Sequence, residues 1–157
     1  MEDMQVADIS GSGEEQTLTY HDSSTRKVIV VDREVPYPEG RLIVSRTDPS
    51  GLLTHVNRSF VEMSGYTENE LIGQPHNILR HPQMPRAAFQ GLWEAVTSGN
   101  KWYGYVKNLR KDGAFYWVYA VVVPNIRNGK TIGFSSVRRK PSRTKIAEAE
   151  ALYANQS

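Results

Sequence analysis

Two histidines and an arginine lie close together in a proline-rich stretch of the chain. His76, Arg80 and His81 fall between Pro75 and Pro85. An imidazole titrates near neutral pH and can donate to a phosphate or ring oxygen, and a guanidinium can bind two phosphate oxygens at once. The three side chains are therefore a candidate site for an anionic ligand. On residue type alone, two exposed histidines and an arginine in a weak surface ion pair explain the stretch as well.

A tryptophan and two asparagines supply groups that suit a planar ring with a polar edge. Trp102 can stack on an aromatic ring, and Asn57 and Asn108 each offer two donors and an acceptor. Each also has a structural explanation. Trp102 begins a predicted strand, where a core tryptophan is as common, and Asn108 can be a polar strand residue. Asn57 precedes a predicted helix, so capping alone explains it.

Several classes of active site are disfavoured by what the sequence lacks. The 157 residues include no cysteine, which excludes disulfides, thiolate metal sites and a cysteine nucleophile. His76 and His81 have no carboxylate pair beside them that would complete a metal site. The sequence contains neither a Gly-x-Gly-x-x-Gly turn after a strand nor a nucleophile elbow. We therefore expect neither an enzyme nor a metal protein.

Charge and hydropathy limit the partners of the chain. A net charge of +2 is too small to indicate nucleic acid as the default partner. The longest apolar run, from Trp117 to Val123, is far shorter than the roughly 20 residues that span a membrane. The N-terminus is acidic and polar and lacks a secretory pattern. We therefore expect a cytoplasmic protein without a membrane span.

Turn and capping signals divide the chain into short elements. Proline, glycine and Asx residues predict turns at 48–51, 111–113 and 127–130. Thr67 and Glu70 form a capping box that predicts a short helix. Apolar spacing predicts further helices over residues 59–63, 86–97 and 142–154. β-Branched and aromatic runs predict strands over residues 27–32, 42–47, 52–56, 102–110, 114–124 and 131–139.

The order of these elements predicts an α+β fold. Two strands, several short helices and three strands joined by tight turns indicate an antiparallel five-stranded sheet with the helices on one face. We expect an N-terminal extension over residues 1–40, a core domain over 41–140 and a C-terminal helix or linker over 141–157. Residues 1 to about 25 have few apolar groups and predict a loose tail.

Three segments resemble the PAS family of sensor domains. Val56-Asn57-Arg58-Ser59-Phe60-Val61-Glu62-Met63-Ser64-Gly65-Tyr66 is similar to its front half, and Asn108-Leu109-Arg110-Lys111-Asp112-Gly113 to its back half. The stretch Gly73-Gln74-Pro75-His76-Asn77-Ile78-Leu79-Arg80-His81-Pro82-Gln83-Met84-Pro85 is more specific. It resembles the PAS domain of bacterial aerotaxis receptors, which binds FAD. The resemblance extends over residues 41–153.

The resemblance implies a cofactor and a set of contacts for it. It assigns FAD binding to His76, Arg80, His81 and Trp102, with Asn57 and Asn108 lining the flavin pocket. Gln83 stands where the family usually has an acidic residue, which predicts an altered affinity or potential. The resemblance also implies a redox or oxygen sensor that signals to a domain in cis, such as a HAMP-like region or chemotaxis transducer, or to a partner protein. A homodimer is one arrangement compatible with this role.

Three alternatives to a flavin sensor stay open. A haem-binding PAS gas sensor could use His55, His76 or His81 as an axial ligand. A PAS domain without a cofactor could act as a dimerisation or docking module. An enzyme is the weakest alternative, because no catalytic constellation is present. The absence of cysteine excludes a light sensor that forms a flavin–cysteine adduct.

Overall fold

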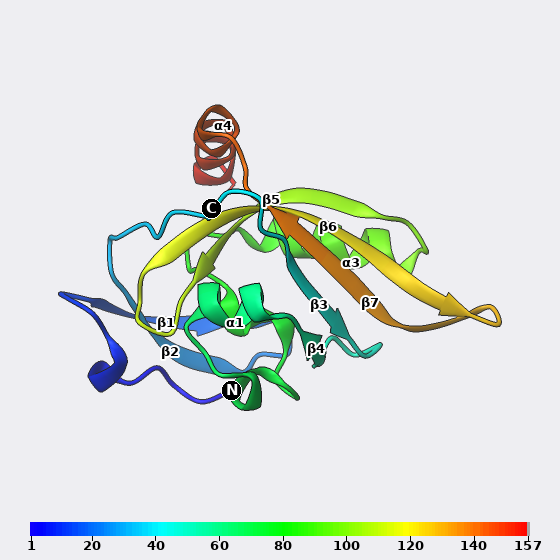
Figure 1. Ribbon diagram of the computed structural model, residues 1–157, viewed down its shortest axis with the longest axis horizontal. Helices are drawn as coiled ribbons and strands as arrows, with labels where there is room; N and C mark the ends of the chain where they lie inside the picture. The colour runs from blue at the N-terminus through cyan, green and yellow to red at the C-terminus, as the bar shows by residue number, and fades with distance from the viewer. Residues whose placement is uncertain (157) are drawn as a thin grey trace.

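A five-stranded antiparallel sheet forms the centre of the computed structural model, which describes residues 1–156 (Figure 1). The strand order is β4-β3-β7-β6-β5, and every neighbouring pair is antiparallel. The strands are β3 (Ile43–Thr47), β4 (Leu53–Val56), β5 (Trp102–Leu109), β6 (Phe115–Arg127) and β7 (Lys130–Arg139). This confirms the predicted α+β fold. Ser157, the last residue of the predicted C-terminal segment, lies outside the described residues.

Tight turns connect the three long strands. Asn128 and Gly129 join β6 to β7, and both have positive φ angles, of 52° and 76°. Two consecutive positive φ angles are typical of the hairpin turn that Asn-Gly favours. Gly113, between β5 and β6, has φ 88°, and the Asp112 carboxylate accepts from the Ala114 amide across that turn. These turns give β5, β6 and β7 their register along the sheet.

Short helices cover one face of the sheet, as predicted. They are α1 (Arg58–Ser64), α2 (Glu68–Leu71), the 3₁₀ helix η2 (His76–Leu79) and α3 (Arg86–Thr97). The capping box of Thr67 and Glu70 is present at the start of α2. Beneath these helices, Tyr116, Val118 and Ala120 of β6 are buried in the main hydrophobic core. Their period of two places one face of β6 toward the helices.

The last helix, α4 (Arg143–Ala154), packs against the other face of the sheet. Ile146 and Ala149 are buried there against Trp117, which alternates with the core residues of β6. The Tyr153 ring stacks on Trp117 with 6.4 Å between centroids, and its hydroxyl donates to the Tyr105 carbonyl at 2.6 Å. Within residues 1–156, no helix has both the length and the apolar character needed to span a membrane.

The predicted loose tail is wrong, because much of the N-terminal segment forms a hairpin. After a 3₁₀ turn, η1 (Val6–Asp8), the strands β1 (Glu14–Thr19) and β2 (Thr25–Val30) pair in a separate two-stranded sheet. Leu18 and Val28 are buried in a small second core with Leu109 at the end of β5. The hairpin can form a core with few apolar residues of its own, because Leu109 of the main domain contributes to the same cluster.

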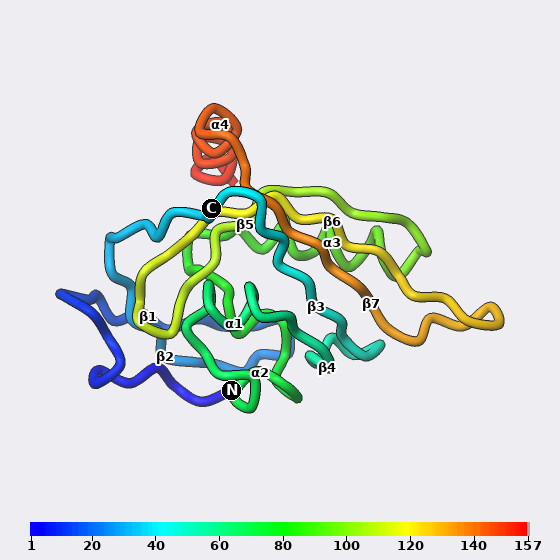
Figure 2. The backbone as a smooth tube through the Cα atoms, viewed as in Figure 1, coloured from blue at the N-terminus to red at the C-terminus, as the bar shows by residue number. Residues whose placement is uncertain are grey.

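The hairpin lies beside the segment that carries α2 and η2 (Figure 2). Arg26 of β2 is only 3% exposed. Its guanidinium donates to the Ile78 carbonyl at 2.9 Å and to the Tyr66 hydroxyl at 3.0 Å. The N-terminal segment therefore stabilises η2 through the hydrogen bond from Arg26 to the Ile78 carbonyl.

Candidate functional site

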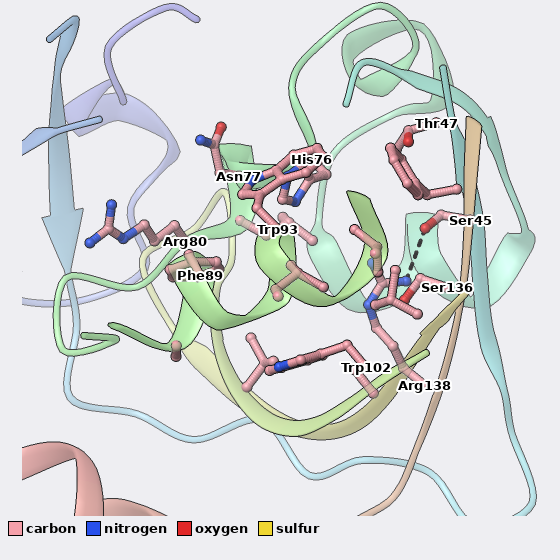
Figure 3. Close-up of a pocket in the computed structure, with 18 of the residues that line it drawn as sticks. Ser45, Thr47, His76, Asn77, Arg80, Phe89, Trp93, Trp102, Ser136 and Arg138 are labelled. Carbon is pink, nitrogen blue, oxygen red and sulfur yellow. Dashed lines mark hydrogen bonds between the residues drawn. The ribbon is translucent and has the colours of Figure 1, made fainter. Parts of the chain in front are cut away.

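A cavity of about 80 Å³ lies between α3 and the helix-covered face of the sheet (Figure 3). We call it the inner cavity. Its wall is mostly apolar and aromatic. The Trp93 ring meets the rings of Phe134 and His76 edge-on, each at 5.5 Å between centroids. Other apolar lining residues are Leu79, Met84, Phe89, Leu92, Val96, Trp102, Val106, Ala120 and Val122.

A wider groove of about 770 Å³ opens beside the inner cavity, and we call it the outer groove. The two spaces share the lining residues His76, Asn77, Arg80, Phe89 and Trp93. The outer groove is further lined by His21, Pro49, Ser50, Arg86, Gln90, Glu94 and Thr97. The site therefore has an apolar inner compartment and a more polar outer one, with a common wall.

The sheet supplies several of the polar groups of the inner cavity. Asn108 on β5 and Ser45 on β3 are buried at its lining. On β7, Phe134, Ser136 and Arg138 follow one another at a spacing of two and all line the cavity. Alternate residues of a strand point to the same face, so the pleat of β7 places a hydroxyl and a guanidinium in the cavity wall.

Three buried polar atoms of the lining lack a hydrogen-bond partner within residues 1–156. They are Asn77 Oδ1, Arg80 Nε and Ser136 Oγ. A buried polar atom left without a partner costs about 1–3 kcal/mol. Their presence around one cavity fits a ligand that carries both donors and acceptors.

Arg80 is the positively charged residue that lines both the inner cavity and the outer groove. Its backbone forms an isolated bridge with Asn108, and its guanidinium lies 5.0 Å from the centre of the Phe89 ring. Burial lowers the pKa of Arg80, opposed in part by nearby Tyr20. No carboxylate within residues 1–156 forms an ion pair with Arg80. Its charge is therefore available to an anion at the boundary of the two spaces.

His76 is neutral at physiological pH. Burial lowers its pKa to about 4, with further lowering by the positive charge of Arg138 and by His21. A neutral imidazole has one donor and one acceptor nitrogen. His76 can therefore both donate to and accept from a ligand in the shared wall.

The structure brings four of the seven predicted contact residues to the inner cavity. They are His76, Arg80, Trp102 and Asn108. His76 and Arg80 also line the outer groove. The side chains that Figure 3 labels come from several elements around a single space. The other three predicted residues, Asn57, His81 and Gln83, are absent from the lining of both spaces.

Asn57 is the N-cap of α1. Its Oδ1 accepts from the amides of Phe60 at 3.0 Å and Val44 at 3.1 Å, and its Nδ2 donates to the Leu42 carbonyl at 2.9 Å. These bonds fasten α1 to β3, which is the structural explanation that its position before a helix allowed.

His81 and Gln83 lie behind the cavity, on the segment that leads into α3. His81 is 1% exposed, and its Nδ1 accepts from the Gln83 amide at 3.0 Å. Burial lowers the pKa of His81 to about 3, helped by the charge of Lys107. The Gln83 side chain accepts from the Lys107 ammonium group. Among the described residues, no group of three or more histidine, aspartate or glutamate side chains could hold a metal ion.

The sequence analysis missed Asn77, Ser136 and Arg138 as lining residues. The signal for Asn77 was its place inside the motif, next to His76. The signal for the other two was the alternation of β7, where Phe134 marks the buried face.

Arg138 lies at the end of the inner cavity away from Arg80 (Figure 3). Its Nη1 donates to Ser45 Oγ at 3.1 Å, and its guanidinium lies 5.2 Å from the centre of the Phe60 ring. Burial lowers its pKa, opposed in part by Tyr116 and Tyr37. None of the ion pairs within residues 1–156 includes it.

Comparison with known sequences gives a family for this arrangement. A family model described as the PAS fold matches residues 53–138. The aerotaxis receptor of Escherichia coli K12 is 45% identical over 124 residues, which are 79% of this chain and 24% of the receptor. The biofilm dispersion protein BdlA of Pseudomonas aeruginosa is 29% identical over 84 residues, 53% of this chain and 20% of that protein. The chain thus spans about a quarter or less of these relatives.

Solved structures share the fold at lower sequence identity. The light-state structure of the blue-light photoreceptor Aureochrome1 LOV has a TM-score of 0.62 and 22% identity, covering 72% of this chain and 88% of that one. A PAS domain from Colwellia psychrerythraea has a TM-score of 0.54 and 27% identity, covering 65% of this chain and 87% of that one. These matches support the same sheet-and-helix architecture around the cavity.

Proposed function

This chain belongs to the PAS family of sensor domains, and we propose that it binds FAD and responds to the redox state of the flavin. The observation that carries the proposal is the pairing of an aromatic inner cavity with an adjoining outer groove that contains two arginines. FAD has two matching parts, a planar ring and a diphosphate that leads to adenosine. His76, Asn77 and Arg80, which line both spaces, are at the place where these parts meet.

In this proposal the inner cavity holds the flavin ring. Trp102 and Trp93 supply aromatic surface, and aromatic rings are favourable neighbours for a planar heterocycle. Asn108 offers both donors and an acceptor to the polar edge of the ring. Ser136 Oγ and Asn77 Oδ1, which have no partner in the described protein, gain one from the ligand.

The outer groove binds the diphosphate. Arg80 and Arg86 supply positive charge, and a guanidinium can bind two phosphate oxygens at once. His21, from the turn of the N-terminal hairpin, lines the same groove. Glu94 is the acidic lining residue, and its carboxylate accepts from the Gln90 amide at 3.1 Å. Two guanidiniums against one carboxylate favour an anionic ligand.

Flavin binding requires α3 to move away from the sheet. The inner cavity of about 80 Å³ is smaller than the roughly 300 Å³ at the lower end of ligand pockets. The shared wall contains Phe89 and Trp93, both on α3. An outward shift of this helix joins the two spaces without disturbing the sheet.

Bound FAD supplies reversible electron uptake, and the sheet carries the response. Asn108 pairs with Tyr116 of β6, whose neighbour Trp117 contacts α4 on the opposite face. A changed hydrogen bond at Asn108 therefore shifts the strand pair that supports α4. We propose that α4 passes the signal to a cytoplasmic signalling domain in cis or to a partner protein, with dimerisation as one possible route.

Reconstitution of the flavin-free protein with FAD tests the ligand and its location. We expect FAD to bind, and Trp102→Ala to weaken its affinity by about 5- to 150-fold, since one stacked aromatic contributes about 1–3 kcal/mol. Tyr103→Ala is the matched control, because Tyr103 is the next residue of β5 and is 55% exposed. Equal affinity of the Trp102→Ala variant and the wild type would place the ring elsewhere.

The same titration separates the rival ligands. Haem binding with a Soret band, in place of FAD binding, would make this a gas sensor with His76 as the candidate axial ligand at the cavity. Rejection of both cofactors would leave a docking module.

A second experiment tests the redox response. We expect amide hydrogen exchange of α4 to differ between oxidised and reduced protein, because α4 packs on strands next to the cavity. Identical exchange along the whole chain in both states would contradict redox sensing while leaving flavin binding intact.

A further inference from the structure

Arg138 occupies a position that the flavin proposal does not yet explain. It lines the inner cavity but is absent from the outer groove, whereas Arg80 lines both. In Figure 3, Arg138 and Ser136 lie at one end of the cavity and Arg80 lies at the other. In the proposed binding mode the flavin ring lies in the inner cavity and the diphosphate in the outer groove. A cation at this end of the cavity is therefore near the ring and away from the diphosphate.

Within residues 1–156, the guanidinium of Arg138 forms no ion pair with a carboxylate. Its neighbours are the Ser45 hydroxyl and the face of the Phe60 ring. The titratable groups that influence it are Tyr116 and Tyr37, and the charge of Arg138 in turn lowers the pKa of His76. All three are neutral at physiological pH in their usual forms.

An uncompensated charge in an apolar wall is costly to bury. The fold nonetheless holds this segment of β7 firmly. The Tyr37 hydroxyl donates to the Arg138 carbonyl at 2.9 Å, and Arg138 pairs with Ile43 and Ala120 on the two neighbouring strands. The position is thus a fixed feature of the sheet. The Ser45 hydroxyl and the Phe60 ring offset part of the burial cost, and a ligand that brings electron density to the cavity would offset more of it.

We propose that Arg138 contacts the flavin ring and stabilises its reduced, anionic form. The inference rests on the flavin binding proposed above. Uptake of two electrons and one proton leaves the ring with one negative charge. A guanidinium favours that charge over the neutral oxidised ring, most strongly in a water-poor cavity. Arg138 therefore raises the midpoint potential of the bound flavin.

The test is a redox titration of the holoprotein with dithionite as the reductant. We expect Arg138→Gln to reduce the preference for reduced over oxidised flavin by at least tenfold, which is about 30 mV for a two-electron couple. Arg138→Lys keeps a positive charge and should stay closer to the wild type. Arg139→Gln is the matched control, because it removes the same formal charge from an exposed neighbour on β7.

A measurement on the wild type covers the case in which Arg138→Gln loses its flavin. The cation disfavours a second proton on the reduced ring. We therefore expect the potential to fall by about 30 mV per pH unit in mildly acidic buffer, as one proton per two electrons requires. A slope of about 59 mV per pH unit, which corresponds to two protons, would overturn the inference.

The outcomes separate the two proposals. If the wild-type protein neither contains nor takes up flavin, this result contradicts the proposed function and also the role of Arg138, which depends on it. A wild type that holds flavin, with a potential unchanged in Arg138→Gln as in Arg139→Gln, overturns the role of Arg138 and leaves flavin binding standing.

Discussion

Asn57 uses both acceptor positions of its amide oxygen within the protein. The amides of Phe60 and Val44 donate to that oxygen, and the Asn57 amide group donates to the Leu42 carbonyl. An N-cap of this kind stabilises a helix by about 1–2 kcal/mol. Because these bonds occupy the amide oxygen of Asn57 and one donor of its amide group, Asn57 has little hydrogen-bonding capacity left for a ligand.

We expect Asn57→Ala to lower the free energy of unfolding by about 1–2 kcal/mol and to leave the FAD affinity of the folded protein unchanged. Urea denaturation and an FAD titration measure the two quantities. Asn57→Asp is the control, since it retains the acceptor oxygens for the cap. Loss of FAD from folded Asn57→Ala protein would show that Asn57 contacts the flavin, as the family resemblance implied.

His81 and His76 give the fold a characteristic pH dependence. Burial is the main cause that lowers their pKa values, to about 3 and about 4, from 6.5 in the unfolded chain. Between the folded and unfolded pKa values, the two imidazoles are therefore protonated in the unfolded state and neutral in the folded state. The resulting stability is fully present above about pH 6.5 and is lost as pH falls toward the folded pKa values.

We expect the free energy of unfolding to decrease between about pH 6.5 and pH 4.5, by up to about 1.4 kcal/mol per pH unit from His81 alone. Urea denaturation at several pH values measures this slope. The carboxylates with lowered pKa values begin to contribute only near and below their unfolded values of about 4. They are Asp22, Asp48, Glu70 and Asp112. His81→Gln should flatten the slope, and a flat wild-type profile would contradict the account.

Residues of the candidate site could be predicted from the sequence only where they belong to a recognisable motif. His76, Arg80, Trp102 and Asn108 belong to recognisable segments and do line the cavity. Arg138 follows no motif. Its role depends on which face of β7 points inward, and on the lack of an ion pair at its guanidinium in the described part of the chain.

At the scale of elements, Arg26 joins the N-terminal hairpin to η2. The three nitrogens of its guanidinium donate to the Ile78 carbonyl, the Tyr66 hydroxyl and the Glu2 carbonyl. Because η2 begins with His76 and ends just before Arg80, this arginine supports the backbone of the proposed binding segment.

We expect Arg26→Met to lower the free energy of unfolding by about 2–4 kcal/mol, because it leaves buried acceptors without donors. FAD affinity should fall as well, since η2 loses its support. Lys27→Met is the control, because Lys27 is exposed and its ion pair with Glu15 is worth at most about 1 kcal/mol. Equal stability of the two variants in urea would refute the supporting role of Arg26.

Local sequence signals predicted most elements of the main domain. The Asn128-Gly129 turn and the Thr67 capping box fix their elements through short-range geometry. In the N-terminal hairpin, β2 corresponds to the strand predicted over residues 27–32, whereas β1 was missed because it buries little on its own. Leu18 is buried in an apolar cluster that includes Leu109, which is remote in sequence.

At the scale of the whole molecule, the sheet separates the cavity from α4. Alternation along β6 places Tyr116 and Ala120 toward the helices and the cavity, and Trp117 toward α4. A change of ligand on one face can therefore reach the other through a single strand. This arrangement suits a sensor whose input and output surfaces lie on opposite sides.

We propose that the inner cavity and the outer groove together bind FAD. The most direct test is the absorption spectrum of the purified protein, with chromatography of the cofactor that is released on denaturation. We predict flavin absorption bands and the release of FAD, stoichiometric with protein after reconstitution. A colourless protein that also rejects added FAD would contradict the account and leave only the PAS fold in place.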